Sequence, residues 1–181
     1  MNAQTPRIPP GGRAEIGALN ALIAKVAGRA TGTGKPLNIF ATLGRHRRLF
    51  LPWLFFAGRL MPGGKLPRQD TELLILRTAS NCGCEYERGH HVRLGRRAGL
   101  TDEQIEQTAQ HEPSKTAFTE RQRNLLTAAD ELHKSRALTE RTWQQLRPLL
   151  SDAELIELCM LVGHYEMLAM TLNTLQVQPE A

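Results

Sequence analysis

Apolar residues recur along this chain at helical spacing. Between residues 14 and 29 they follow three- and four-residue intervals and lie on one side of an amphipathic helix: Ile16, Leu19, Leu22, Ile23 and Val26. Pro36 is expected to open a short helix to about Leu43, and Pro52 another to Leu60, because proline is tolerated in a first turn. Period-two alternation between turns is absent, so the pattern predicts no strands.

Helix-start motifs recur in the second half of the chain. A hydrophobic residue, a Ser or Thr N-cap, and an apolar residue five positions after the first form a hydrophobic staple at residues 100–105, 138–143 and 150–155. Gln104 and Glu154 complete capping boxes at two of them, and Thr119 with Gln122 forms another. These motifs predict helices at 102–110, 120–134, 140–146 and 152–175. Apolar residues on more than one face of the last helix indicate burial between layers or subunits.

Candidate chemistry is concentrated in the stretch 66–99. A largely buried helix carrying Glu72 should end near residues 81–83, and a second should run from Cys84 to Ala98, with Gly99 left-handed. At about 100° per residue, Cys84, Glu87 and His91 share a sector of roughly 60° on the second helix. The helix dipole should favour an anion in the first turn, so we expect the Cys84 thiol to ionise more easily than a buried one.

Composition narrows the classes of protein. The 181 residues, 41% apolar and 23% charged, fit a flexible tail over 1–12 and a single all-helical domain over 13–181. Three cysteines make no disulfide framework, and we expect no apolar stretch to reach the roughly 18–20 residues of a membrane span. We therefore expect a cytoplasmic protein without a membrane partner. A net charge of +5 without a nucleic-acid module argues against nucleic-acid binding and suits a small anionic carboxylate.

The spacing of Glu72, Cys84 and His91 resembles the carboxymuconolactone decarboxylase and alkylhydroperoxidase D group. That pattern has a Glu, a Cys-x-x-Cys twelve residues later, and a His four residues after the second Cys. Here Cys84 follows Glu72 by twelve residues, Tyr86 fits a common position inside the motif, and His91 follows Cys84 by seven. The similarity covers about residues 66–109. It implies an all-α, alkylhydroperoxidase D-like helical bundle that associates into a dimer, trimer or hexamer.

The sequence departs from this pattern at one position, because Glu87 occupies the place of the second cysteine. In the peroxidase branch of the group the two cysteines cycle between dithiol and disulfide, while Glu and His relay protons. Cys82 is the nearest substitute, but a Cys82–Cys84 disulfide would close a very short ring. The decarboxylase branch uses acid and base chemistry without a redox pair. The substitution therefore favours that branch.

The leading hypothesis is a lyase-type enzyme that performs cofactor-free acid and base chemistry on a small, anionic organic substrate. Its candidate catalytic residues are Glu72, Cys84, Glu87 and His91, and its candidate substrate-binding residues are Tyr86 and His90. Two close buried carboxylates could not both ionise easily, so one would hold a proton near neutral pH. No metal site is predicted, although carboxylates and an imidazole on facing helices could form one.

Two alternatives remain open. A thiol-dependent peroxidase, an oxidoreductase with peroxiredoxin-type activity, would attack peroxide through Cys84 and be reduced by Cys82 or an external thiol. A non-catalytic helical oligomer or metal-binding protein would keep the fold without the reaction. Sequence alone leaves the substrate and the number of subunits open.

Overall fold

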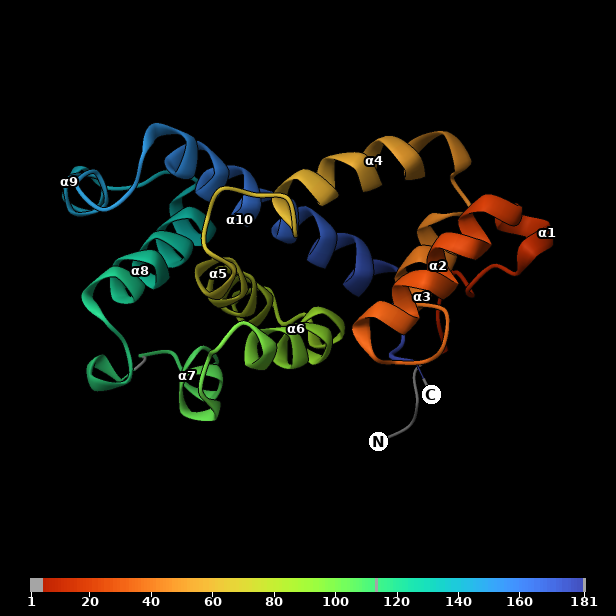
Figure 1. The fold of residues 1–181 in the computed structure, drawn as a ribbon, viewed down its shortest axis with the longest axis horizontal. Coiled ribbons are helices and arrows are strands. Elements are labelled where there is room, and N and C mark those ends of the chain that lie inside the picture. Colours follow the sequence, from red (N-terminus) through yellow and green to blue (C-terminus); the bar gives the residue numbers. More distant parts are fainter. Residues whose placement is uncertain (1–4, 113, 181) are drawn as a thin grey trace. The chain divides into compact units, whose positions relative to one another are not determined.

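The computed structural model describes residues 5–112 and 114–180, and within these ranges every regular element is a helix (Figure 1). The α-helices are α1 Arg13–Ile16, α2 Ala18–Thr31, α3 Asn38–Leu43, α4 Arg47–Leu60, α5 Arg68–Asn81, α6 Glu85–Arg97, α7 Asp102–Gln107, α8 Glu120–Ser135, α9 Glu140–Leu146 and α10 Asp152–Leu175. A short 3-10 helix, Lys115–Ala117, precedes α8. The all-helical prediction is confirmed for the described ranges.

The chain forms two compact units. The central unit is Gly58–Ala169, and the other combines the chain up to Ala57 with the chain from Met170 onward. Helices α4 and α10 contribute to both. The single domain predicted over 13–181 and the flexible tail predicted over 1–12 stay predictions. Residues 1–4 lie outside the described ranges, while the Arg7 and Gly11 amides donate to the backbone oxygens of Leu175 and Ala41.

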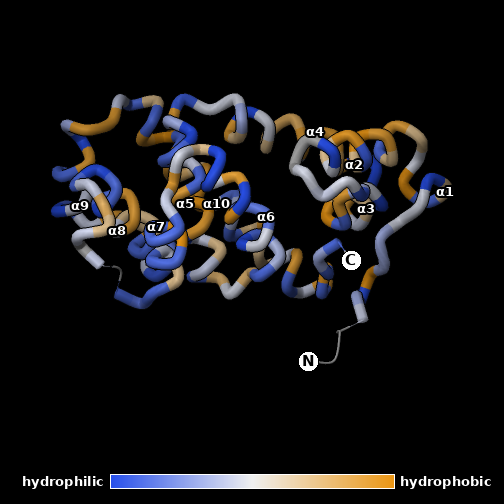
Figure 2. The backbone as a smooth tube through the Cα atoms, turned by 60° about the horizontal axis from the view of Figure 1, so that its bottom comes forward, coloured by the Kyte–Doolittle hydropathy of each residue, from blue (hydrophilic) through white to orange (hydrophobic). Residues whose placement is uncertain are grey.

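In the unit that holds the N-terminal helices, aromatic rings join α3 to α4. The rings of Phe40, Phe50 and Trp53 lie with centroids 5.8–5.9 Å apart, and α4 is hydrophobic over much of its length (Figure 2). Helix α4 begins at Arg47, so the prediction that Pro52 opens it is wrong. Both Pro52 and Arg48 are exposed, and water can satisfy the Arg48 carbonyl that the proline leaves without a donor. Phe55 is 67% exposed and is not the core residue its apolar neighbours suggested.

The central unit is organised around α5, whose residues from Asp70 to Ala79 are all buried. Helix α5 packs against α6 and α8. One core cluster of this unit unites side chains from several elements: Leu73, Leu76, Leu100, Ile105, Phe118 and Leu126. Burial of α5 on all sides explains why its polar residues must find partners inside the protein.

The predicted helix starts of this unit are confirmed. Thr101 with Gln104 and Thr119 with Gln122 form complete capping boxes, and Ser151 and Glu154 bond reciprocally. Gly99 has the expected left-handed φ of 95°. These local motifs determine where α7, α8 and α10 begin, and contacts with distant residues are not needed for this.

Helix α10 has the bounds predicted for the last helix, but it meets the length and composition criteria for a membrane span. An 18-residue window within Asp152–Leu175 reaches a mean hydropathy of 1.4, so by length and composition alone this helix could cross a membrane. The expectation that no stretch meets those criteria is therefore wrong. Of that window, 61% is buried inside the protein, as in the core helix of a water-soluble fold.

Candidate active site

Helices α5 and α6 are joined by a tight turn that aligns their functional residues. Gly83 has a φ of 58°, which glycine adopts without strain, and the Cys84 amide donates to the Ala79 carbonyl at 2.8 Å. Cys84 is the N-cap of α6. Further along α6, a Cβ added to Gly95 would lie only 3.2 Å from the Leu76 and Leu100 methyl groups. The glycine therefore allows α6 to approach α5 closely.

Glu72 and His91 form a buried pair across these two helices. The His91 Nδ1 lies 2.6 Å from Glu72 Oε2, and the Glu72 side chain is completely buried. Arg68, one turn earlier on α5, donates its Nη2 to Glu72 Oε1. Both carboxylate oxygens thus have partners. A carboxylate that accepts from Nδ1–H fixes the imidazole ring and leaves Nε2 to accept a proton.

Tyr165, on a third helix, α10, packs against His91 of this pair. Its ring meets the His91 ring edge-on at 5.2 Å with an interplanar angle of 87°, and its hydroxyl donates to Met61 Sδ at 3.6 Å. Burial raises the pKa of the Tyr165 hydroxyl well above its ordinary value, with Glu72 and Glu87 adding to the rise. It therefore stays protonated and neutral near pH 7.

Glu87 is a buried acid on the first turn of α6. Its residue is 3% exposed, and neither carboxylate oxygen accepts a hydrogen bond of ordinary geometry within the described residues. Burial raises the pKa of Glu87 to about 8, and the neighbouring Cys84 thiol lowers it in part. This raised pKa favours the protonated acid near neutral pH, and its main cause is burial rather than repulsion from Glu72. A pKa of about 8 corresponds to about nine-tenths protonation at pH 7.

The Cys84 thiol behaves opposite to our expectation. Cys84 is 1% exposed, and burial, followed by the nearby Glu87 carboxylate, raises the pKa of its thiol to about 12. Desolvation outweighs the helix dipole here, because the thiol is sealed from water. The pKa of Cys82, which is half-buried, also rises, to about 11, mainly through burial and the Glu166 carboxylate.

Tyr86 and His90, the predicted substrate contacts, pair with one another. Their ring centroids lie 4.7 Å apart, and His90 Nδ1 is 3.2 Å from Arg93 Nη2. Tyr86 is buried and His90 is half-buried. Contact of either residue with a substrate stays a prediction.

The sequence analysis named neither Arg68 nor Tyr165 among the candidate site residues. Arg68 precedes Glu72 by four residues, a spacing that predicts an ion pair on one helix face and could have revealed it. Tyr165 is 74 positions beyond His91, so only the packing of α10 reveals their contact. Cys159 is exposed, because its side of α10 faces outward.

The comparisons with known proteins agree with this arrangement. Residues 49–131 match the model of the carboxymuconolactone decarboxylase family. No curated protein sequence matches the chain.

Several solved structures share the fold. An uncharacterised peroxidase-related protein from Ralstonia eutropha, with an alkylhydroperoxidase AhpD core, gives a TM-score of 0.81 at 19% identity, over 96% of this chain and 93% of the other. A variant of the debrominase Bmp8 in complex with 2,3,4-tribromopyrrole gives 0.81 at 16% identity, over 99% and 95%. A putative antioxidant defence protein AhpD from Agrobacterium tumefaciens gives 0.66 at 21% identity, over 74% and 91%.

At such identities the likeness establishes the fold, and the family match covers the helices that hold Glu72, Glu87 and His91. The resemblance read from the spacing of these residues is thereby confirmed: residues 49–131 match the carboxymuconolactone decarboxylase family, and the chain shares the fold of alkylhydroperoxidase D-like structures.

Proposed function

We propose that this chain is a cofactor-free enzyme that transfers protons to and from a small anionic organic substrate, as a lyase of the carboxymuconolactone decarboxylase type. The observation that carries the proposal is the buried Glu72–His91 pair together with Glu87, a buried acid one turn before His91 on α6, whose pKa is raised by burial to about 8. A base and an acid of different protonation state in one sheltered place are the elements of general acid–base catalysis.

In this proposal His91 is the base and Glu87 the acid. Glu72 and Arg68 hold the imidazole in one orientation, so that Nε2 can take a proton from the substrate. For a decarboxylation, the electron pair of the broken carbon–carbon bond stays on the substrate as CO₂ leaves. Glu87 gives its proton to that carbon and regains one from solvent, so one proton is consumed for each CO₂ released.

Arg68 supports an anionic substrate. Its Nη1 is buried and has no hydrogen-bond partner within the described part of the chain, while Nη2 is engaged by Glu72. A buried guanidinium donor without a partner is costly, and a carboxylate oxygen of a substrate would satisfy it. Tyr165, neutral and beside His91, would help to exclude water from the reacting atoms.

The test is the exchange of solvent deuterium into carbon positions of candidate substrates. A panel of small carboxylic acids, a carboxymuconolactone among them, is incubated with the protein in D₂O and followed by proton NMR. We expect a substrate whose exchange or decarboxylation falls by about 10²- to 10⁴-fold in His91→Gln and in Glu87→Gln. Glu85→Gln, at an exposed acid of the same helical turn, is the matched control and should retain the activity.

Unchanged exchange in both His91→Gln and Glu87→Gln, with their folds intact, would contradict the proposal. Loss of the activity in Cys84→Ser alone would favour thiol chemistry instead.

The thiol-peroxidase alternative has support from the names of some structural neighbours but less from the site itself. With a thiol pKa of about 12, only about one Cys84 in 10⁵ is a thiolate at pH 7. Peroxide attack requires that thiolate. We therefore rank acid–base chemistry first.

A further inference from the structure

A second polar cluster lies where α5, α8 and α10 meet, and it is built from different residues. Cys82 ends α5, His133 is in the last turn of α8, and Glu166 is on α10. Cys82 Sγ is 3.9 Å from His133 Nδ1, which is 2.8 Å from Glu166 Oε1. All three of these ligand-type atoms lie within 4.8 Å of one another. Cys82 and His133 are half-buried, and Glu166 is buried.

These distances are close to those that a tetrahedral zinc ion requires. With ligand bonds of about 2.3 Å to sulfur and 2.0–2.1 Å to nitrogen or oxygen, neighbouring ligand atoms are about 3.3–3.6 Å apart. The sulfur–nitrogen distance here is slightly longer and the nitrogen–oxygen distance slightly shorter. The third distance, from the Cys82 sulfur to the Glu166 oxygen, is at most 4.8 Å, so relative shifts of about 1 Å would bring the three atoms to tetrahedral separations.

We propose that Cys82, His133 and Glu166 bind a zinc ion, with the fourth coordination position open. Thiolate and imidazole together select zinc over hard cations such as Mg²⁺ or Ca²⁺, and three protein ligands are the number found in zinc sites that keep an exchangeable position. Binding displaces the Cys82 proton to solvent. The two negative ligands and neutral His133 then balance the charge of Zn²⁺.

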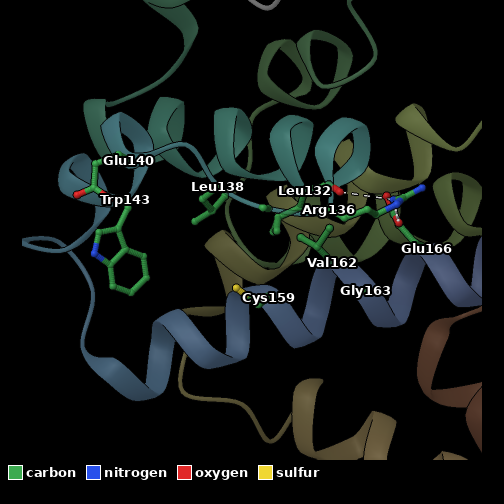
Figure 3. Close-up of a pocket in the computed structure, with 10 residues that line it drawn as sticks. Leu132, Arg136, Leu138, Glu140, Trp143, Cys159, Val162, Gly163 and Glu166 are labelled. Carbon is green, nitrogen blue, oxygen red and sulfur yellow. Dashed lines mark hydrogen bonds and ion pairs between the residues drawn. The ribbon is translucent and has the colours of Figure 1, made fainter.

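A hollow next to the cluster provides room at the open position. It has a volume of about 590 Å³ and is lined mainly by apolar side chains of α8, α9 and α10, with Arg136 and Glu166 among the lining residues. Figure 3 shows Arg136 and Glu166 at one end of the hollow and Trp143 at the other. A water molecule or a small anion could therefore reach the metal.

Arg136 is the group that opposes the ion. Its Nη1 donates to Glu166 Oε2, the oxygen that does not face His133. The guanidinium neutralises Glu166 when no metal is bound and repels a cation when one arrives. Arg136 itself has a φ of 60°, a conformation that asparagine also tolerates.

This cluster suits a metal better than the catalytic carboxylates do. Glu72 already gives one oxygen to Arg68 and the other to His91, so a metal there would have to displace both. In the Cys82 cluster a metal would replace the contacts of His133 Nδ1 with Glu166 Oε1 and with Cys82 Sγ, while the Arg136 contact on the other Glu166 oxygen would stay.

The test is a titration of the metal-free protein with Co²⁺ and Zn²⁺. We expect one equivalent to bind, with a thiolate-to-cobalt charge-transfer band and the intense visible bands of a tetrahedral ion. Cys82→Ser should abolish the charge-transfer band, and His133→Gln and Glu166→Gln should weaken binding by about 100-fold or more, since even outer-shell partners are worth 10- to 100-fold. Arg136→Asn should tighten binding, by about tenfold.

The controls separate this site from its neighbours. Cys84→Ser, two residues away, Cys159→Ser, in the same hollow, and His91→Gln should all bind the metal as the unchanged chain does. Circular dichroism confirms that each variant is folded, and Arg136→Asn keeps the test informative if a ligand variant does not fold. The proposal is overturned if the unchanged chain binds no metal, if Cys82→Ser keeps the band, or if binding is lost in His91→Gln instead.

Discussion

Replacement of Glu87 by glutamine should stabilise the protein, and increasingly so as the pH rises. Glu87 is 3% exposed, and its carboxylate oxygens lack hydrogen-bond partners within the described residues. Its folded pKa is raised from 4.5 to about 8. The folded state therefore binds more protons than the unfolded state between these values, and the sign of the linkage makes stability fall as the pH rises through that window.

The magnitude follows from the two pKa values. Relative to a neutral side chain, an acid with these values costs the folded state about 1 kcal/mol at pH 5, about 3 kcal/mol at pH 7 and about 4 kcal/mol at pH 8. Glutamine has nearly the same shape and never ionises, so Glu87→Gln should remove this cost. The gain should therefore grow by about 3 kcal/mol between pH 5 and pH 8.

The assay is urea unfolding of both proteins at pH 5, 6, 7 and 8, followed by circular dichroism. Glu85→Gln, at an exposed position of the same turn, is the matched control and should show no comparable pH-dependent gain. If the difference between Glu87→Gln and the unchanged chain is the same at pH 5 and pH 8, Glu87 does not carry a raised pKa, and the reasoning from its burial is refuted.

Three further predictions concern the thiol, the core and the surface. Hydrogen peroxide consumption by the purified protein at pH 7 should be slow and nearly unchanged in Cys84→Ser, because the thiol is protonated; a large loss would reverse the ranking of the two functions. Leu73→Ala removes a fully buried side chain of the α5 core and should lower the free energy of unfolding, measured by urea denaturation, by about 2–5 kcal/mol. A change under about 1 kcal/mol would mean that the surrounding side chains close the space and leave no cavity. We also propose that the exposed apolar side chains of Ile156, Met160 and Met167 on α10 form an interface between copies of the chain. Met160→Lys should then shift the mass measured by light scattering toward that of the monomer. An unchanged mass would exclude these residues as the interface.

Local capping motifs explain why the starts of several helices could be predicted correctly from the sequence. Thr101, Thr119 and Ser151 satisfy their helices through partners three residues away, so these starts could be read without the fold. Pro52 could not be read this way. Its effect depends on whether water can reach the carbonyl one turn earlier, which is a property of the folded surface.

The candidate site was predictable where its residues share one helical face or a familiar spacing. Glu72 and His91 are such a pair, and they meet at 2.6 Å. A carboxyl protonated near neutral pH was expected, but the raised pKa values of Glu87 and Cys84 come mainly from burial under neighbouring helices, which position in a helix turn does not reveal.

The proposed zinc site illustrates the same limit. Its residues, Cys82, His133 and Glu166, are separated by 51 and 33 positions in the chain and follow no metal-binding spacing. Sequence analysis accordingly predicted no metal site. Only the convergence of α5, α8 and α10 brings the three side chains together.

The most direct test of the acid–base account is a titration of Glu87 itself. With the glutamate side-chain carboxyls labelled with ¹³C, the resonance that disappears in Glu87→Gln identifies this residue, and its shift is followed from pH 4 to pH 9. The account predicts a midpoint near pH 8, with Glu87 protonated at neutral pH beside the Glu72–His91 pair. A midpoint near the ordinary glutamate pKa of about 4.3 would contradict it, because the site would then hold no carboxylic acid able to donate a proton at pH 7.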